Sequence, residues 1–224
     1  MDKPTIDPDR TRALLDTPYV RVFELAYEDG TRYFDATRHD REHLLALKDD
    51  QALRDELPDA VACCLVLAPP EQAPRMVLFR EYRYPCAQFL LSIPSGLIDE
   101  SDRTAKDPLV ASMSREIFEE CGIVLTESDT IEVVNPFLYN SPGLTDESCA
   151  LLAVTVRSEA ALTHAGAQGT ERLADFVLIE RDVAWRILRD GRDPWGIRYP
   201  FVTWAALMCF VHSTWDPQKT RVRR

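Results

Sequence analysis

Three glutamates, Glu116, Glu119 and Glu120, stand close enough in the sequence to act on one ligand. On a helix, spacings of three and four residues place their side chains on one sector, where each like-charged pair costs roughly 0.2–0.5 kcal/mol. Arg115 stands four residues before Glu119 and offsets only part of this charge. A divalent cation would relieve the rest, and magnesium prefers carboxylate and phosphate oxygens. The alternative is a solvated acidic helix face without a ligand.

A helix over residues 107–121 is predicted on independent grounds. Asp107 is a good N-terminal cap, and Pro108 suits the first helical position. Gly122 favours a stop at the C-terminal end. The apolar face, at helical spacing, consists of Val110, Met113, Ile117 and Cys121. This face should be buried, which leaves the glutamates on the adjoining sector.

Two stretches of the chain together resemble the Nudix box. The first is Gly96-Leu97-Ile98-Asp99-Glu100-Ser101-Asp102, and the second is Arg115-Glu116-Ile117-Phe118-Glu119-Glu120-Cys121-Gly122-Ile123. The second stretch matches the Arg-Glu-aliphatic-x-Glu-Glu-x-Gly-aliphatic half of the box at every specified position. The first half departs from the pattern, because Asp102 replaces a glutamate and twelve residues separate it from Arg115 where the box has seven. The role of Asp102 is therefore left open.

The resemblance implies a metal site with a defined set of ligands. Glu116 and Glu120 match the main metal ligands of the family, and Glu119 matches a further carboxylate that binds metal or orients water. The backbone carbonyl of Ser95 matches another ligand. The implied cofactor is Mg²⁺, with Mn²⁺ as an alternative. Gly96, Arg115 and Gly122 match residues that shape the site and orient its ligands.

The flanks of the box resemble a narrower group, the ADP-ribose and related nucleoside-diphosphate-sugar pyrophosphatases. Arg83, in Glu81-Tyr82-Arg83-Tyr84-Pro85, matches a substrate-binding arginine, and its alternative is a surface arginine paired with Glu81. Ser141 and Glu147, in the Ser-Pro-Gly loop, match substrate contacts, and their alternative is turn chemistry alone. In the loop at 158–173, Glu171 is the expected general base, and its alternative is a solvated loop residue. His164 is expected to be a surface histidine.

The implied function is hydrolysis of the diphosphate bond of a nucleoside diphosphate sugar, with ADP-ribose giving AMP and ribose 5-phosphate. A different diphosphate is the first alternative, such as GDP-mannose, another sugar nucleotide or a dinucleotide cofactor. A non-catalytic ligand sensor on the Nudix fold is the second. The resemblance also implies a homodimer, in which an N-terminal hairpin reaches the partner subunit.

The expected fold class is α+β, and the resemblance refines it to an α/β/α sandwich with a mixed sheet. A hairpin is predicted at 19–36, and residues 1–17 are expected to be poorly ordered. The other predicted elements are strands at 60–67, 75–82, 89–93, 131–134, 148–156 and 174–179, and helices at 182–189 and 201–212. We divide the chain into an N-terminal extension (1–57), a hydrolase domain (58–191), and a C-terminal helix and tail (192–224).

The overall charge limits the possible partners. The formal net charge is −11, and an acidic surface disfavours general nucleic-acid binding. No stretch is apolar and long enough to predict a membrane span or a signal peptide, so a cytoplasmic location is expected. The six cysteines include no Cys-x-x-Cys pair and are interpreted mainly as buried free thiols.

Overall fold

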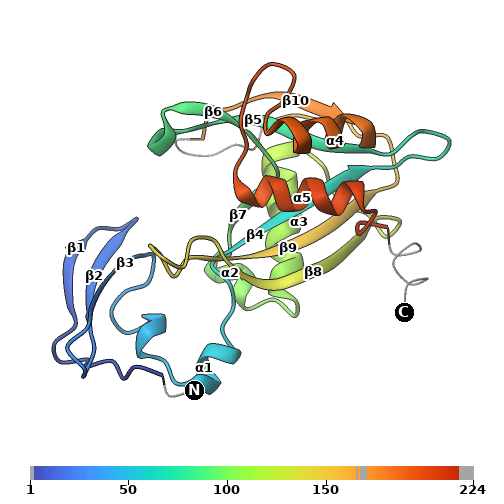
Figure 1. The fold of residues 1–224 in the computed structure, drawn as a ribbon. Helices are drawn as coiled ribbons and strands as arrows, with labels where there is room; N and C mark the ends of the chain where they lie inside the picture. The colour runs from blue at the N-terminus through green and yellow to red at the C-terminus, as the bar shows by residue number, and fades with distance from the viewer. Residues whose placement is uncertain (1–2, 165, 167–170, 217–224) are drawn as a thin grey trace. The chain divides into compact units, whose positions relative to one another are not determined.

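The computed structural model describes residues 3–164, 166 and 171–216. The chain divides into two compact units (Figure 1). The first unit consists of Met1–Asp59 together with Tyr139–Ser148, and the second consists of Ala60–Leu138 together with Cys149–Arg224. The loop that contains the Ser-Pro-Gly motif therefore belongs to the first unit, although it lies between two strands of the second in sequence.

The first unit contains a three-stranded antiparallel sheet. Its strands are β1 (Arg12–Asp16), β2 (Arg21–Ala26) and β3 (Arg32–Thr37), in the order β1-β2-β3. The predicted hairpin is confirmed, and Gly30 in its turn has a φ of 91°, which glycine adopts without strain. The expectation of disorder before residue 17 is wrong, because β1 pairs with β2 and Ile6 forms a bridge with Tyr27.

The segment Tyr139–Ser148 is held to this sheet by several hydrogen bonds. The amide of Ala36 donates to the carbonyl of Leu144 at 3.0 Å, and the hydroxyl of Tyr33 donates to the carbonyl of Gly143 at 3.0 Å. A short 3-10 turn, η1 (Leu45–Leu47), and a one-turn helix, α1 (Asp50–Arg54), complete the unit. These bonds fix the conformation of the Ser-Pro-Gly loop relative to β3.

The first unit also buries the carboxylate of Asp35, which accepts a bond from the amide of Asp146 at 3.1 Å. Burial and the charge of Asp146 raise the pKa of Asp35 to about 6 from its usual 3.8. Ionisation of this group therefore opposes folding. This destabilisation is absent at pH values below the pKa of Asp35 in the unfolded state, and it is complete at pH values above its pKa in the folded state.

We expect Asp35→Asn to stabilise the protein by about 2 kcal/mol at pH 7.5 and by little at pH 4. The amide oxygen of asparagine can still accept the bond from Asp146, while the buried charge is removed. Urea denaturation at both pH values measures the difference, and Asp16→Asn, on the exposed strand β1, is the control. An equal effect of Asp35→Asn at both pH values would contradict the expectation.

The second unit is built on a mixed sheet. Its main strands run in the order β10-β5-β4-β9-β8: β10 (Leu173–Ile179), β5 (Arg75–Arg83), β4 (Ala60–Leu67), β9 (Ser148–Val156) and β8 (Thr130–Tyr139). Strands β4 and β9 pair in parallel, whereas β5 is antiparallel to both β4 and β10. Two shorter strands join the sheet, β6 (Gln88–Ser92) beside β5 and β7 (Ser95–Leu97) beside β4.

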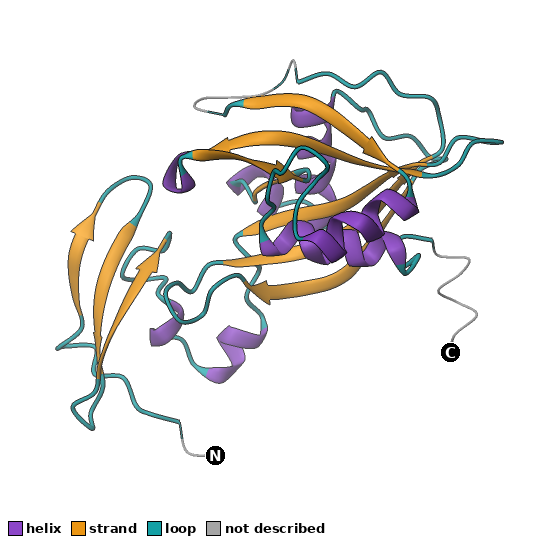
Figure 2. Cartoon of the chain, turned by 45° about the horizontal axis from the view of Figure 1, so that its top comes forward, coloured by secondary structure: helices purple, strands orange, loops and turns teal. Residues whose placement is uncertain are grey.

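Alternate residues of the central strand β4 enter two separate cores. Ala62, Cys64 and Val66 face a core shared with the helices α4 (Arg181–Asp190) and α5 (Phe201–Val211). The residues between them face a second core, which contains the apolar side of α3 (Pro108–Cys121). Figures 1 and 2 show the sheet with these helices on its two faces. The predicted α+β class with a mixed sheet is confirmed.

The helix α3 follows its sequence signals closely. The side chain of Asp107 accepts from the amide of Val110 at 3.2 Å, and Gly122 ends the helix with a φ of 71°. The segment before α3 contains a short helix, α2 (Glu100–Arg103), in which Asp102 is buried.

The C-terminal segment completes the first of the two cores. Helices α4 and α5 pack against each other, and α5 contributes Leu207 and Phe210 to the interior. Trp215 is also buried there, with its indole N–H donating to the carbonyl of Phe210 at 3.2 Å. Helix α5 has no charged residue, but no helix in the described part of the chain is long and apolar enough to span a membrane.

Candidate active site

Helix α3 carries two buried carboxylates one turn apart. Glu116 is 6% exposed and Glu120 is 4% exposed, whereas Glu119 is half-buried on the same side. Helix propensity alone does not explain why two glutamates point inward, because an ionised carboxylate loses much of its hydration on burial. Their positions follow from the packing of the apolar face of α3 on the sheet. The glutamates lie on the adjoining side of the helix, so this packing places them at the edge of the core.

The surroundings make ionisation of this pair unfavourable. Burial raises the pKa of Glu116 to about 7, although the neighbouring Arg115 lowers it. Burial and the nearby charges of Glu116, Glu81 and Glu171 raise the pKa of Glu120 well above its usual value. A cation bound among these oxygens would favour the ionised forms, since an opposite charge lowers a carboxyl pKa.

Strand β7 places the backbone next to these carboxylates. Ser95 pairs with Ala62 of β4, and its amide donates to Oε2 of Glu120 at 2.9 Å. A side chain at position 96 would overlap the carboxylate of Glu116, so only glycine permits this approach. The sequence prediction singled out the carbonyl of Ser95, whereas the contact formed in the structure is made by its amide.

We expect Gly96→Ala to lower activity by about 100-fold, because a new Cβ displaces the Glu116 carboxylate by the order of an ångström. The assay is the magnesium-dependent diphosphate hydrolysis that the Nudix resemblance implies, with circular dichroism to establish that the variant folds. Ala105→Ser, in the loop after α2, is a control for a small change near α3. Wild-type activity in a folded Gly96→Ala variant would show that the position of Glu116 is unimportant.

Arg115 forms hydrogen bonds with several groups on and around the acidic side of α3. Its guanidinium donates to Oε1 of Glu116 at 2.7 Å, to Oε2 of Glu119 at 3.2 Å and to the carbonyl of Leu97 at 2.8 Å. It also donates twice to Oδ2 of Asp102, at 3.1 and 2.9 Å. One planar side chain thus connects α2, β7 and two glutamates.

The role of Asp102, which the sequence left open, follows from this arrangement. Its carboxylate accepts from the hydroxyl of Ser112 at 2.9 Å as well as from Arg115. Burial raises the pKa of Asp102, but these hydrogen bonds outweigh it and leave the pKa lowered. Helix α2, which ends one residue after Asp102, presents this carboxylate to Arg115. Asp102 is therefore an orienting residue in the structure.

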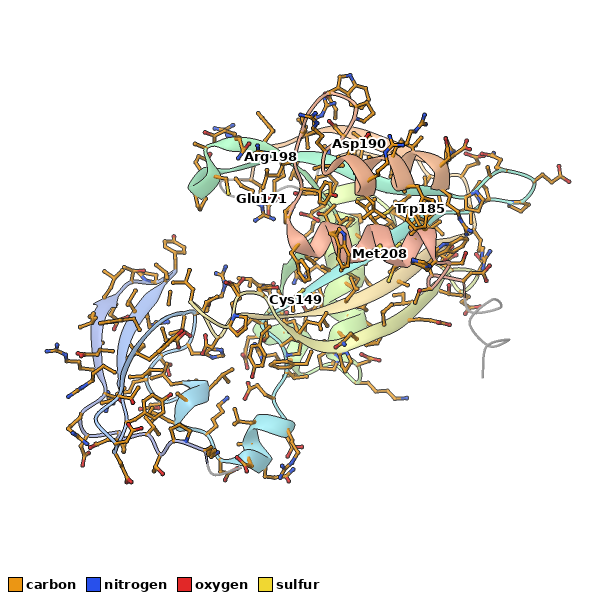
Figure 3. All side chains as sticks on the ribbon, in the orientation of Figure 1. Cys149, Glu171, Trp185, Asp190, Arg198 and Met208 are labelled. Carbon is orange, nitrogen blue, oxygen red and sulfur yellow. The ribbon has the colours of Figure 1, made fainter. Side chains whose placement is uncertain are left out.

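A second group of charged residues lies where β5 ends and β10 begins. Glu171, labelled in Figure 3, stands just before β10, and the carbonyl of Arg172 accepts from the amide of Tyr82 at 3.0 Å. Arg83 is at the end of β5 and pairs with Glu81 at 2.7 Å. The charge of Glu171 raises the pKa of both Glu116 and Glu120, after burial and nearer charges. The predicted base and the helical glutamates therefore share one electrostatic environment.

Ser141 and Glu147 belong to the first unit. The carboxylate of Glu147 accepts from Nε of Arg38 at 2.7 Å and from Nδ2 of Asn140 at 3.0 Å. The carbonyl of Ser141 accepts from the amides of Leu144 and Thr145, at 2.9 and 3.0 Å. The bonds to the carbonyl of Ser141 form a turn, and Glu147 is held by an ion pair with Arg38 and by the amide of Asn140.

His164 has a role that the sequence interpretation missed. It is not a free surface histidine, because Nδ1 lies 2.6 Å from the carbonyl of Glu120 and Nε2 lies 3.2 Å from the carbonyl of Ala174. Its ring stacks on Phe176 at 3.9 Å. The amide of Thr163 also donates to the carbonyl of Cys121 at 3.0 Å. The loop thus satisfies backbone carbonyls at the end of α3, which no local pattern in the sequence indicated.

The carboxylates do not form a complete metal cage by themselves. Across residues 3–164, 166 and 171–216, no three His, Cys, Asp or Glu side chains are arranged to hold a metal ion. Glu116 is turned toward Arg115, and Glu120 toward the amide of Ser95. A magnesium ion does not need three protein carboxylates, since it commonly takes one or two together with substrate phosphates. The donor set therefore fits magnesium.

Two known proteins are similar to part of this chain. A Caenorhabditis elegans protein named "Putative nudix hydrolase 2" is 36% identical over 85 residues, 38% of this chain and 34% of that protein. An uncharacterized Nudix hydrolase of Schizosaccharomyces pombe is 33% identical over 98 residues, 44% of this chain and 43% of that protein. Both matches support the Nudix family. The chain spans less than half the length of either relative, and no family model matches it.

The Nudix signature also agrees with the geometry of the site. The residues of the signature that carry charge, Arg115, Glu116, Glu119 and Glu120, form one connected set on α3. Of the two glycines of the signature, Gly96 lies against the carboxylate of Glu116, and Gly122 is the C-terminal cap of α3. The charged residues that resemble the Nudix box therefore lie together in the structure.

Proposed function

We propose that this protein is a metal-dependent hydrolase of a diphosphate bond. The observation that carries the proposal is the burial of Glu116 and Glu120, one turn apart on α3, beside the half-buried Glu119. Arg115 is the only cation that pairs with Glu116 or Glu119 within the described residues, and it is shared with Asp102. A buried charge without a full complement of partners is costly, and a bound cation would offset that cost for Glu116 and Glu120.

The metal ligands would come from α3 and from the strand before it. Glu116 and Glu120 would hold Mg²⁺, or Mn²⁺, with Glu119 and the carbonyl of Ser95 as further oxygen donors. When bound, the metal would neutralise phosphate charge and lower the pKa of a coordinated water. Arg115 keeps the carboxylates oriented, and Gly96 leaves the space that they occupy.

Residues outside α3 would bind the substrate and accept the proton. Arg83 is half-exposed, and its planar guanidinium suits two phosphate oxygens. Glu171 would take the proton of the attacking water as general base. Water attacks one phosphorus, the bridging P–O bond breaks, and the leaving phosphate takes the electron pair. Ser141 and Glu147 are proposed as further substrate contacts, because their loop resembles the Ser-Pro-Gly loop of the narrower group.

The proposed substrate is a nucleoside diphosphate sugar, and ADP-ribose is the first candidate, with AMP and ribose 5-phosphate as products. The sequence segments around Arg83 and Ser141 support this group. We also propose a cytoplasmic homodimer. Exposed apolar side chains on the sheet of the first unit support an interface there: Leu14, Leu15, Tyr33 and Phe34.

A substrate panel with magnesium tests the proposed function. ADP-ribose, GDP-mannose, another sugar nucleotide and a dinucleotide cofactor are incubated with the protein, and the products are identified by mass spectrometry. We expect AMP and ribose 5-phosphate from ADP-ribose, and no products when the magnesium is chelated. Turnover of another diphosphate alone would reject the substrate and keep the reaction. Magnesium and ligand binding without products would favour a ligand sensor.

A further inference from the structure

Glu81 is a buried carboxylate that the proposed reaction does not use. It lies on β5, and its side chain is 12% exposed. Because side chains alternate along a strand, Glu81 shares a face with Val77 and Phe79, which pack in the core on the α3 side. Its neighbours in the sheet are Leu173 of β10 and Leu90 of β6. A carboxylate between two leucines requires a specific partner to offset its burial.

The partner of Glu81 is Arg83, two residues later on the same face of the strand. Oε2 of Glu81 lies 2.7 Å from Nη2 of Arg83. The arginine side chain is 45% exposed, so much of the guanidinium faces solvent while one nitrogen is held from within. A guanidinium has five N–H donors, and one bond to Glu81 leaves donors for a ligand. One guanidinium nitrogen of Arg83 is therefore held by Glu81, while much of the guanidinium stays open to solvent.

Glu81 interacts electrostatically with Glu120 of α3 and with Glu171. The amide of Tyr82 donates to the carbonyl of Arg172, so Glu171 stands next to the end of β5. Burial raises the pKa of Glu81, the charge of Arg83 and a hydrogen bond with the side chain of Ser92 lower it, and the charge of Glu171 raises it further. Glu81 in turn contributes to the raised pKa of Glu120, after burial and the charge of Glu116. A further negative charge in this environment is unfavourable for stability alone.

We propose that Glu81 is a positioning residue, which holds the guanidinium of Arg83 in a fixed orientation toward the diphosphate of the substrate. The inference rests on the proposed function and deepens it. A glutamine at this position would be less costly to bury, but its neutral oxygen binds a guanidinium more weakly than a carboxylate does. Preorganising Arg83 lowers the entropy that substrate binding must otherwise offset. The effect of Glu81 is therefore exerted through Arg83.

The test compares the kinetics of Glu81→Gln, Arg83→Ala and the double variant on the diphosphate substrate that the wild type hydrolyses. We expect Glu81→Gln to raise KM about 10-fold, the lower range for a charge-assisted hydrogen bond, with kcat within about twofold. In the Arg83→Ala background, Glu81→Gln should cause no further loss, because its effect requires the arginine. Additive losses in the double variant would overturn the proposal.

A second variant separates geometry from charge. Glu81→Asp keeps the charge but shortens the side chain by one methylene, so it should raise KM as Glu81→Gln does. A wild-type KM in a folded Glu81→Asp variant would overturn the positioning role. If Glu81→Gln does not fold, the KM of Glu81→Asp decides the test. The matched control is Asp175→Asn, which removes an exposed ion pair to Arg80 on the opposite face of β5 and should leave KM unchanged.

Magnesium titration by calorimetry excludes a different role for Glu81. The magnesium affinity of Glu81→Gln should equal that of the wild type, whereas a loss of 10-fold or more would make Glu81 a metal ligand and overturn the proposal. Failure of the proposed function is distinguishable. If the wild type hydrolyses no diphosphate, the proposed function and the role of Glu81 are both rejected. If the wild type hydrolyses a diphosphate and Glu81→Gln has the same KM, only the role of Glu81 is rejected.

Discussion

Glu120→Gln should lower kcat by on the order of 100-fold or more, since even residues one step removed from a metal cost 10–100-fold when replaced. The amide oxygen of glutamine can keep the bond from the amide of Ser95, so the backbone near β7 should be unchanged. The amide is neutral, however, and neutral oxygens bind magnesium less strongly than carboxylates do. The loss should therefore reflect metal binding rather than folding.

The same variant should be more stable than the wild type without metal. Burial raises the pKa of Glu120 well above its usual value, and the charge of Glu116 raises it further, so removal of this charge relieves repulsion in the metal-free protein. Added magnesium should raise the Tm of the wild type and have little effect on the variant. Activity and stability are thus expected to change in opposite directions.

Hydrolysis assays and thermal denaturation with and without magnesium check both expectations. Glu100→Gln, an exposed glutamate of α2, is the control and should behave as the wild type does. Full activity of Glu120→Gln would remove Glu120 from the site. A variant that loses both activity and metal-free stability would indicate a purely structural glutamate.

Arg115→Ala should lower the free energy of unfolding by about 3 kcal/mol, the range for removing one partner of a buried charge network. The substitution removes five hydrogen bonds, to Asp102, Glu116, Glu119 and the carbonyl of Leu97. Asp102 and Glu116 then remain buried with fewer partners. Activity should also fall, because the carboxylates of α3 lose their orientation.

A double variant tests whether the instability arises from the unpaired Asp102. Asp102→Asn should restore part of the stability lost in Arg115→Ala, because asparagine leaves no buried charge. Arg186→Ala, which breaks the exposed pair with Asp182, is the control and should cost less than about 1 kcal/mol. Urea denaturation measures the wild type, the two single variants, the double variant and the control. Purely additive effects of the two substitutions would show that Arg115 and Asp102 do not act together.

The residues of the candidate site were predicted unevenly, for physical reasons. Helix α3 was predicted to within a residue because its cap, its apolar periodicity and its terminal glycine are local signals that all agree. Glu116, Glu119 and Glu120 followed from that helix and from the box. Asp102 could not be assigned, because its partner Arg115 is thirteen residues away and α2 had no strong sequence signal.

The N-terminal part shows where local patterns are insufficient. The hairpin of β2 and β3 was predicted from its apolar residues and from Gly30 in its turn. Strand β1 was missed, because its side chains are exposed and only pairing with β2 stabilises it. The contacts of His164 with backbone carbonyls of Glu120 and Ala174 were missed for a similar reason, since a backbone carbonyl leaves no trace in the sequence.

The sequence by itself determined the acidic helix, its boundaries, the Nudix resemblance and the α+β class, since each depends on residue types at short, fixed spacings. Only the tertiary structure decided which charges are buried together. It brought Asp102 to Arg115 and Ser95 to Glu120, and it buried the carboxylate of Glu81. It also placed the Ser-Pro-Gly loop on the sheet of the first unit. Burial and long-range pairing depend on packing between distant segments, which local spacing does not encode.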